Sequence, residues 1–171
     1  MGKKSTKENK NIYQQYRENC ELTRDPASER MGGVSADRIE KIENEKSLAH
    51  PDEVLSMAEC YKMPDLCNYF CSHDCPIGRQ YVPEIQLKDL SQIVLEMLAS
   101  LNSIEGEKNR LIEITVDGEI SADEMEDFLE IQNKLEKISI TVEALQLWGE
   151  KTIAEGKIDK ELLNQVKSLS K

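Results

Sequence analysis

The sequence is poor in the residues on which most active sites and membrane segments depend. Only two of its 171 residues are histidine, there is one tryptophan, and aromatic residues make up 5% of the chain. No run of uncharged apolar residues approaches the roughly 18 that a membrane span requires. Phosphate-binding loops, nucleophile elbows and zinc-protease motifs are all missing. We therefore expect a protein that is not an enzyme and does not enter a membrane.

Basic residues are also scarce relative to acidic ones. The chain has 22 Lys and Arg against 33 Asp and Glu, which gives a net charge of −11. This excess excludes a protein that coats nucleic acid through nonspecific phosphate contacts. The charge is uneven, because residues 1–80 carry −2 and residues 81–171 carry −9. With 39% hydrophobic residues and no secretory signal at the N-terminus, the composition indicates a helix-rich cytoplasmic protein.

The first 64 residues predict a compact all-α domain that follows a short arm. Residues 1–11 hold four lysines and no apolar periodicity, so we expect a flexible basic arm. From residue 12 to residue 64, apolar residues recur at helical spacing in short segments, two of which Gly32-Gly33 separates. Thr23 and Ser35 are good N-caps. Four short helices joined by tight turns are the expected structure of residues 12–64.

After a connector at residues 65–85, the chain predicts a long antiparallel helical hairpin over residues 86–171. Apolar residues from Leu87 to Leu111 and from Phe128 to Leu145 follow alternating steps of three and four, as in paired helices. A turn is expected at Asp117-Gly118, and a short helix is expected after Asp159. Further apolar residues lie beside each seam: Ile93, Leu98, Ile112, Leu129, Ile140 and Leu147. They favour a second buried face and a homodimer; the alternative is a seam used up within one chain.

Three of the five cysteines lie at regular spacing in the connector. Cys67, Cys71 and Cys75 follow C-x3-C-x3-C, which would place three thiols on one face of a helix. Such thiolates would suit a zinc or iron–sulfur site, with Cys60 or His73 as the fourth ligand. The same spacing suits a thiol redox sensor, or buried structural thiols without any cofactor. Buried thiols are the interpretation that we favour, and we expect no cofactor.

Residues Leu22–Glu43 read LTRDPASERMGGVSADRIEKIE, with Leu-Thr at the start, Gly-Val-Ser in the middle and Ile-x-x-Ile-Glu at the end. These elements resemble the DNA-binding domain of the XRE (Cro/C1-type repressor) helix-turn-helix family. The segment from Pro51 to Tyr61 resembles the family's fourth helix, so that the resemblance covers about residues 11–66. The whole chain is similar to uncharacterised clostridial regulators, which join this domain to a Cys-rich connector and a helical tail.

The resemblance implies that the helix after Ser35 enters the major groove with its N-terminal residues on base edges. The residues that it assigns to DNA contact are Arg24, Ser35, Ala36, Asp37, Arg38 and Lys41. Arg38 would reach a guanine, and Ser35 a phosphate. Two features depart from this pattern: Asp37 and Glu40 add carboxylates to the helix, and residues 11–64 hold 7 basic and 11 acidic residues, a net −4.

These patterns favour a sequence-specific transcriptional regulator that binds double-stranded DNA and dimerises through its C-terminal helices. The alternative is an interaction adaptor, in which the helix-turn-helix no longer binds DNA and the acidic C-terminal half binds a protein partner.

Overall fold

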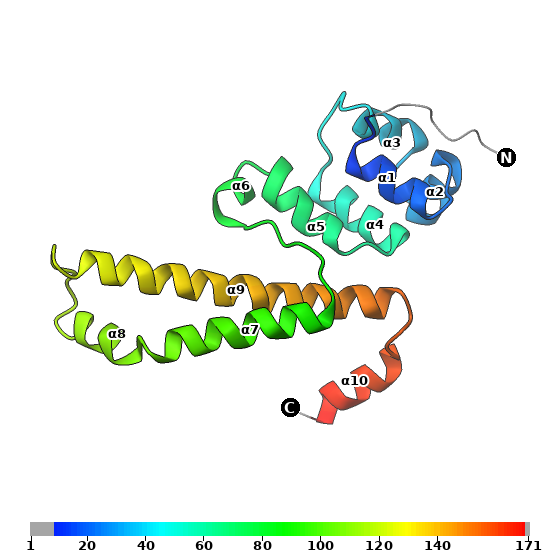
Figure 1. The fold of residues 1–171 in the computed structure, drawn as a ribbon. Helices are drawn as coiled ribbons and strands as arrows, with labels where there is room; N and C mark the ends of the chain where they lie inside the picture. Colours follow the sequence, from blue (N-terminus) through cyan, green and yellow to red (C-terminus); the bar gives the residue numbers. More distant parts are fainter. Residues whose placement is uncertain (1–8, 170–171) are drawn as a thin grey trace. The chain divides into compact units, whose positions relative to one another are not determined.

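The computed structural model describes residues 9–169, and in that range it contains helices and no strands (Figure 1). The prediction of an all-α protein is confirmed. Contacts divide the chain into two compact units: one has the residues up to Glu84 and those from Glu150, and the other is Ile85–Gly149. Among the described helices, none combines the length and the apolar character that crossing a membrane requires. The predicted basic arm lies mostly at residues 1–8, outside the described range.

The first unit begins with short helices whose ends the sequence defines. They are α1 (Ile12–Asn19), α2 (Arg24–Met31), α3 (Ala36–Glu43) and α4 (Pro51–Tyr61). Asn11 caps α1 by accepting a hydrogen bond from the Gln14 backbone N–H at 3.0 Å. Gly32 ends α2 in the left-handed conformation at φ 68°, which glycine adopts without steric cost. Each of these helices is therefore bounded by local chemistry before any packing is considered.

The connector continues the same unit and does not form a separate linker. It contains α5 (Asp65–Tyr69), the π-helical turn η1 (Phe70–Asp74) and α6 (Gly78–Tyr81). Leu66 and Phe70 are buried in the core that α1 to α4 form. The fully buried side chains of that core include Ala27, Ile39, Met57, Tyr61 and Leu66.

Two tyrosines of α1 bind the connector to the domain. The Tyr13 hydroxyl donates to Asp74 Oδ2 at 2.6 Å, and the Tyr16 hydroxyl donates to the Asp65 carboxylate. Because both carboxylates lie in the connector, these hydrogen bonds hold α5 and η1 against α1.

The second unit is a helical hairpin made of α7 (Leu90–Glu105), α8 (Lys108–Ile114) and most of α9 (Met125–Ala154). Gly106 separates α7 from α8, so the predicted first long helix is interrupted there. Two ion pairs hold the end of the hairpin: Arg110 Nε lies 2.6 Å from Asp127 Oδ2, and Lys134 Nζ lies 2.8 Å from Glu107 Oε1. The last helix, α10 (Lys160–Leu169), follows Asp159, whose side chain accepts from the Glu161 backbone N–H.

The buried stripe of the hairpin matches the predicted seam only in part. Ile131, a predicted seam residue, is 1% exposed, whereas Leu101 and Leu135 of the same seam are 44% and 45% exposed. On α7 the buried residue is Ile93, which lies one position before the predicted seam residue Val94. Apolar residues cover a wide arc of α7, and the spacing alone does not choose between two neighbouring stripes.

A close approach of α6 to η1 generates a first prediction. A Cβ atom added at Gly78 would lie 2.0 Å from the Cys71 carbonyl oxygen, whereas nothing lies within 4 Å of one added at Gly149. We expect Gly78→Ala to lower the free energy of unfolding by at least about 2 kcal/mol, because backbone must move to admit the methyl group.

Urea unfolding followed by circular dichroism measures this change. Gly149→Ala, inside α9, is the matched control and should leave stability unchanged or raise it by up to about 1 kcal/mol. Equal stabilities for the two variants would contradict the close packing of α6 on η1.

Candidate nucleic-acid interface

Helices α2 and α3 and the turn between them form the surface to which the sequence assigned DNA contact. They pack through Ala27, Val34 and Ile39, all of which are buried. Ser35 caps α3 by accepting a hydrogen bond from the Arg38 backbone N–H at 3.2 Å. Thr23 precedes α2 in extended conformation, but its side chain makes no capping hydrogen bond.

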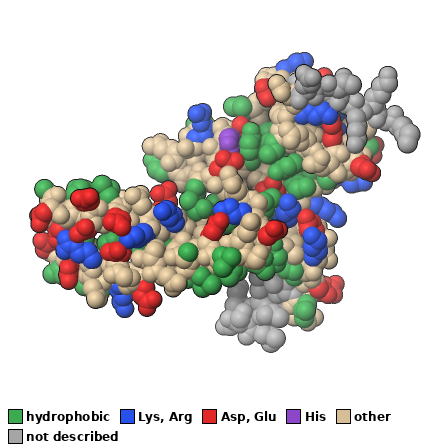
Figure 2. Space-filling model, in the orientation of Figure 1, with side chains coloured by type: hydrophobic (Ala, Val, Ile, Leu, Met, Phe, Trp, Pro, Cys, Tyr) green, Lys and Arg blue, Asp and Glu red, His purple; other side chains and the backbone are tan. Residues whose placement is uncertain are grey.

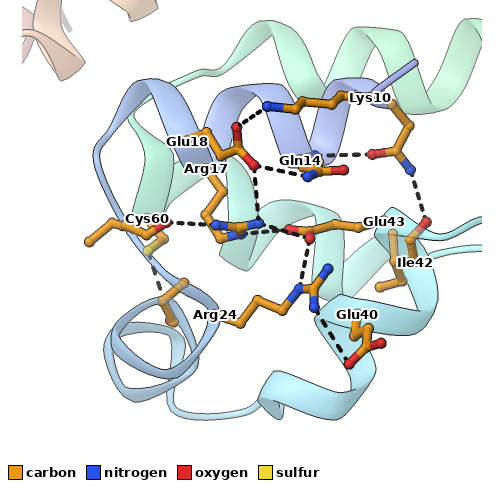
Figure 3. A network of polar contacts seen from close by, with 12 residues as sticks. Lys10, Gln14, Arg17, Glu18, Arg24, Glu40, Ile42, Glu43 and Cys60 are labelled. Atoms are coloured by element: carbon orange, nitrogen blue, oxygen red, sulfur yellow. Dashed lines mark hydrogen bonds and ion pairs between the residues drawn. The ribbon is translucent and has the colours of Figure 1, made fainter. Parts of the chain in front are cut away.

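One buried carboxylate connects three helices beneath this surface (Figure 3). Glu43 of α3 is fully buried, and Arg17 of α1 donates to both of its oxygens at 2.6 and 2.9 Å. Arg24 of α2 donates from Nε to Glu43 Oε2 at 2.9 Å. Burial alone would lower the pKa of Arg17, but the hydrogen bonds and charge of Glu43 raise it above its usual value. Arg17 therefore stays charged, as a buried pair requires.

The same contacts direct Arg24 away from solvent. Arg24 binds a second carboxylate in addition to Glu43, because its Nη1 lies 3.5 Å from Oε2 of Glu40, one turn earlier in α3. The Arg24 side chain is about one-third exposed. A guanidinium held by two carboxylates of the same domain is already neutralised. Arg24 is therefore engaged within the chain, and its contact with DNA stays a prediction.

Arg38, the predicted guanine contact, is also engaged within the chain. Its Nε and Nη2 donate to the two oxygens of Glu53 at 2.6 and 2.8 Å, a bidentate pair. Its Nη1 donates to Ser47 Oγ at 2.6 Å, and Nη2 also donates to the Leu48 carbonyl oxygen at 2.8 Å. Glu53 in turn accepts from the His50 backbone N–H at 2.7 Å and so caps α4. Arg38 therefore fixes α3, the following loop and α4 to one another.

The remaining predicted contacts lie at the open side of α3. Asp37 and Lys41 are exposed, one helical turn apart, with Lys41 Nζ 3.6 Å from Asp37 Oδ2. Ser35 is exposed and Ala36 is half-buried. Four of the six assigned residues therefore lie at one surface, and the two arginines, with side chains 32% and 23% exposed, bind carboxylates of the same chain.

The cysteines of the connector do not form a ligand set. Cys75 N–H donates to the Phe70 carbonyl oxygen, five residues back, so the π-helical turn η1 disrupts the regular i, i+4, i+8 face. Cys67, Cys71 and Cys75 instead pack against the apolar core. Burial, and then the neighbouring Cys71, raise the pKa of the Cys67 thiol, which disfavours the thiolate that a metal needs.

The proposed fourth ligands point elsewhere. Burial raises the pKa of the Cys60 thiol as well, and His73 stacks on Tyr69 with ring centroids 4.3 Å apart. Within residues 9–169, no group of three or more His, Cys, Asp or Glu side chains is placed to hold a metal ion. The thiols of the cluster are partly buried, and their interpretation as structural thiols without a cofactor stays a prediction.

In comparisons with known proteins, no family model, no curated protein and no solved structure matches the chain.

Sequence reasoning missed the residues that hold this surface together. Glu43 appeared only as the last residue of the Ile-x-x-Ile-Glu pattern, and Glu53 only inside the segment from Pro51 to Tyr61. A usable signal was present for Arg17 and Glu43, because each occupies a position on the apolar side of its helix. A charged residue at such a position is seldom fully buried without a partner of opposite sign.

The buried pair generates a second prediction. Glu43→Gln leaves two guanidinium groups without their carboxylate, so we expect a loss of about 3–5 kcal/mol in the free energy of unfolding. Glu40→Gln removes an exposed carboxylate from the same Arg24 and should cost less than about 1 kcal/mol. Urea denaturation of both variants makes the comparison, and similar losses would show that Glu43 is not the central partner.

The Arg38–Glu53 pair generates a third prediction, which depends on pH. The hydrogen bonds from Arg38 hold the pKa of Glu53 below its ordinary value of 4.5. A lowered pKa in the folded state stabilises the fold above the unfolded-state pKa, and this contribution disappears as pH falls through the folded-state value. We therefore expect Arg38→Ala to be destabilised relative to the parent at pH 7, with a difference that shrinks below about pH 4.5.

A double-mutant cycle isolates the pair. We expect Arg38→Ala and Glu53→Ala to be coupled by about 1–2 kcal/mol at pH 7. A coupling near zero, or a difference between Arg38→Ala and the parent that grows in acid, would contradict the assignment.

Proposed function

We propose that the chain is a transcriptional regulator that binds double-stranded DNA through α3 and acts as a homodimer through its C-terminal helices. The observation that carries the proposal is the open side of α3 beside α2, with Ser35 at the cap and with Asp37 and Lys41, which lie 3.6 Å apart, exposed on the helix. In a helix-turn-helix protein, this part of the second helix approaches base edges. The resemblance of residues 11–66 to the XRE family supports the same assignment.

The contacts differ from those of an arginine-reading helix. Lys41 would contact a phosphate or a guanine edge, and the Asp37 carboxylate would accept a hydrogen bond from the amino group of a cytosine. Ser35 would donate to a phosphate beside the N-terminus of α3. Arg24 and Arg38 would support these residues from behind, because their guanidinium groups hold α3 in place.

Selection from a duplex library with a randomised centre of roughly 20 base pairs, long enough for two half-sites one turn apart, tests the proposal. We expect an enriched sequence whose affinity falls steeply as salt is raised. Lys41→Ala should weaken binding to that sequence by about tenfold, since one good contact contributes roughly 1–3 kcal/mol. Asp37→Ala should relax the preference at one base pair.

Arg79→Ala is the matched control for Lys41→Ala, because it removes one exposed positive charge from α6 of the same unit. It should leave affinity within about twofold of the parent if binding depends on α3 and not on total charge. If no sequence is enriched at low salt, or if the two variants lose affinity equally, the proposal fails.

A second function, an interaction adaptor that ignores DNA, is favoured by one observation. Both predicted DNA-contacting arginines pair with carboxylates within the chain, and the exposed carboxylates Asp37 of α3 and Glu45 just after it add negative charge to this surface. An acidic surface of this kind repels phosphate and attracts basic protein segments. Under this alternative, the same library would show no enrichment at low salt, and a lysine-rich peptide would bind with salt-sensitive affinity that Asp37→Ala weakens.

A further inference from the structure

The hairpin leaves part of its apolar surface uncovered. Six side chains, each between 38% and 52% exposed, make up what we call the flank face: Leu90, Val94, Leu98 and Leu101 of α7, and Leu135 and Val142 of α9. Figure 2 shows hydrophobic side chains gathered on the hairpin surface over α7. Isolated apolar residues are normal on a protein surface, but a contiguous set marks an interaction site.

The six residues lie on one side of the hairpin. In an α-helix each residue advances the side-chain direction by about 100°. Viewed from the N-terminus of α7, its four members of the flank face therefore lie roughly 50–130° clockwise from the buried stripe that contains Ile93. Leu135 and Val142 are displaced in the same sense from the buried stripe that contains Ile131. Helices α7 and α9 run antiparallel (Figure 1). A rotation in the same sense about each helix axis therefore brings the α7 and α9 members of the flank face to the same side of the hairpin.

Between Leu90 and Leu101 the flank face is free of charge, although the surrounding half of the chain is strongly acidic and Glu105, one turn after Leu101, bounds the flank at the end of α7. Between Leu90 and Leu101 the one charged residue is Glu96, which pairs with Lys88 at 2.8 Å on the opposite flank. On α9, Glu136 and Glu143 lie on the outer side by the same 100° rule. The neutral residues Ser139 and Gln146 complete this flank.

This pattern specifies the partner. A net charge of −9 over residues 81–171 makes two copies repel each other, and an uncharged flank is the surface on which that repulsion is smallest. A heptad step of seven residues separates Val94 from Leu101 on α7 and Leu135 from Val142 on α9, and Leu90 lies one turn before Val94. The single hairpin leaves all of these side chains partly exposed. A helix pair with the same repeat fits such positions, and the second copy supplies one.

We propose that the flank face binds the flank face of a second copy about a two-fold axis, so that two hairpins form a four-helix bundle. Each copy then contributes the same six side chains to a closed, self-complementary interface. This inference deepens the homodimer part of the proposed function by naming its surface, and it does not depend on DNA binding.

Sedimentation equilibrium of the full chain without DNA tests the inference. We expect the parent to be dimeric at micromolar concentration and Leu135→Glu to raise the dimer dissociation constant by at least about 30-fold, as for a central interface residue. Leu129→Glu is the matched control, because Leu129 lies on the same helix with 48% exposure but outside the flank face. It should leave the dissociation constant within about threefold of the parent.

A charge-swap experiment separates a lost interface from a damaged fold. Leu135→Glu and Leu135→Lys should each be monomeric with parental helix content, and an equimolar mixture of the two should recover a mixed dimer. A monomeric parent at tens of micromolar, or equal weakening by Leu129→Glu and Leu135→Glu, would overturn the inference. A dimer that binds no duplex would defeat the DNA-binding proposal alone, and a monomer that binds a half-site would defeat this inference alone.

Discussion

The buried carboxylate of Glu43 is the constraint on which the N-terminal unit depends. A carboxylate withdrawn from water costs several kcal/mol unless cations and hydrogen bonds replace its hydration. Arg17 and Arg24 supply that replacement from α1 and α2, so that three helices meet at one charge. With Glu43 buried, both arginines are engaged within the chain, since Arg17 also donates to the Leu22 carbonyl oxygen and Arg24 also pairs with Glu40. The arrangement of the three helices and the pairing of Arg24 within the chain therefore have one cause.

Arg38 adds a second constraint on the other side of α3. Its four hydrogen bonds reach α4 and the loop before it, so α3 is fixed to α1 and α2 at its C-terminal end and to α4 near its start. Helix α3, held this firmly, presents a defined surface. That surface has few basic groups, because the fold itself uses the arginines. Under the proposed function, recognition would depend on Ser35, Asp37 and Lys41, and the local geometry of these residues would matter more than net attraction.

The sequence predicted those parts of the fold that local chemistry and apolar spacing determine. Ser35 caps α3, and Gly32 ends α2 where the Gly-Gly pair separates two helical segments, both from patterns visible in the chain. It did not predict which carboxylate each arginine would choose, because Arg38 and Glu53 are fifteen residues apart and meet only after α3 and α4 pack. The sequence also did not predict the π-helical turn η1. This turn changes the directions of the Cys71 and Cys75 side chains from those of a regular α-helix, but no residue type in the segment indicates it.

The shifted seam of the hairpin follows from the same limit and has an energetic consequence. A heptad pattern predicts an apolar stripe on a helix but does not say which helix packs against it. The apolar surface of α7 is wide enough to contact two different helices. The polar side chain of Thr141 lies inside the single hairpin, while Leu101 and Leu135 remain half outside it. Covering the exposed residues would add apolar burial worth about 25 cal/mol per Å² that the isolated hairpin does not gain. The proposed dimer would therefore link the stability of this unit to self-association, so that stability rises with protein concentration by mass action.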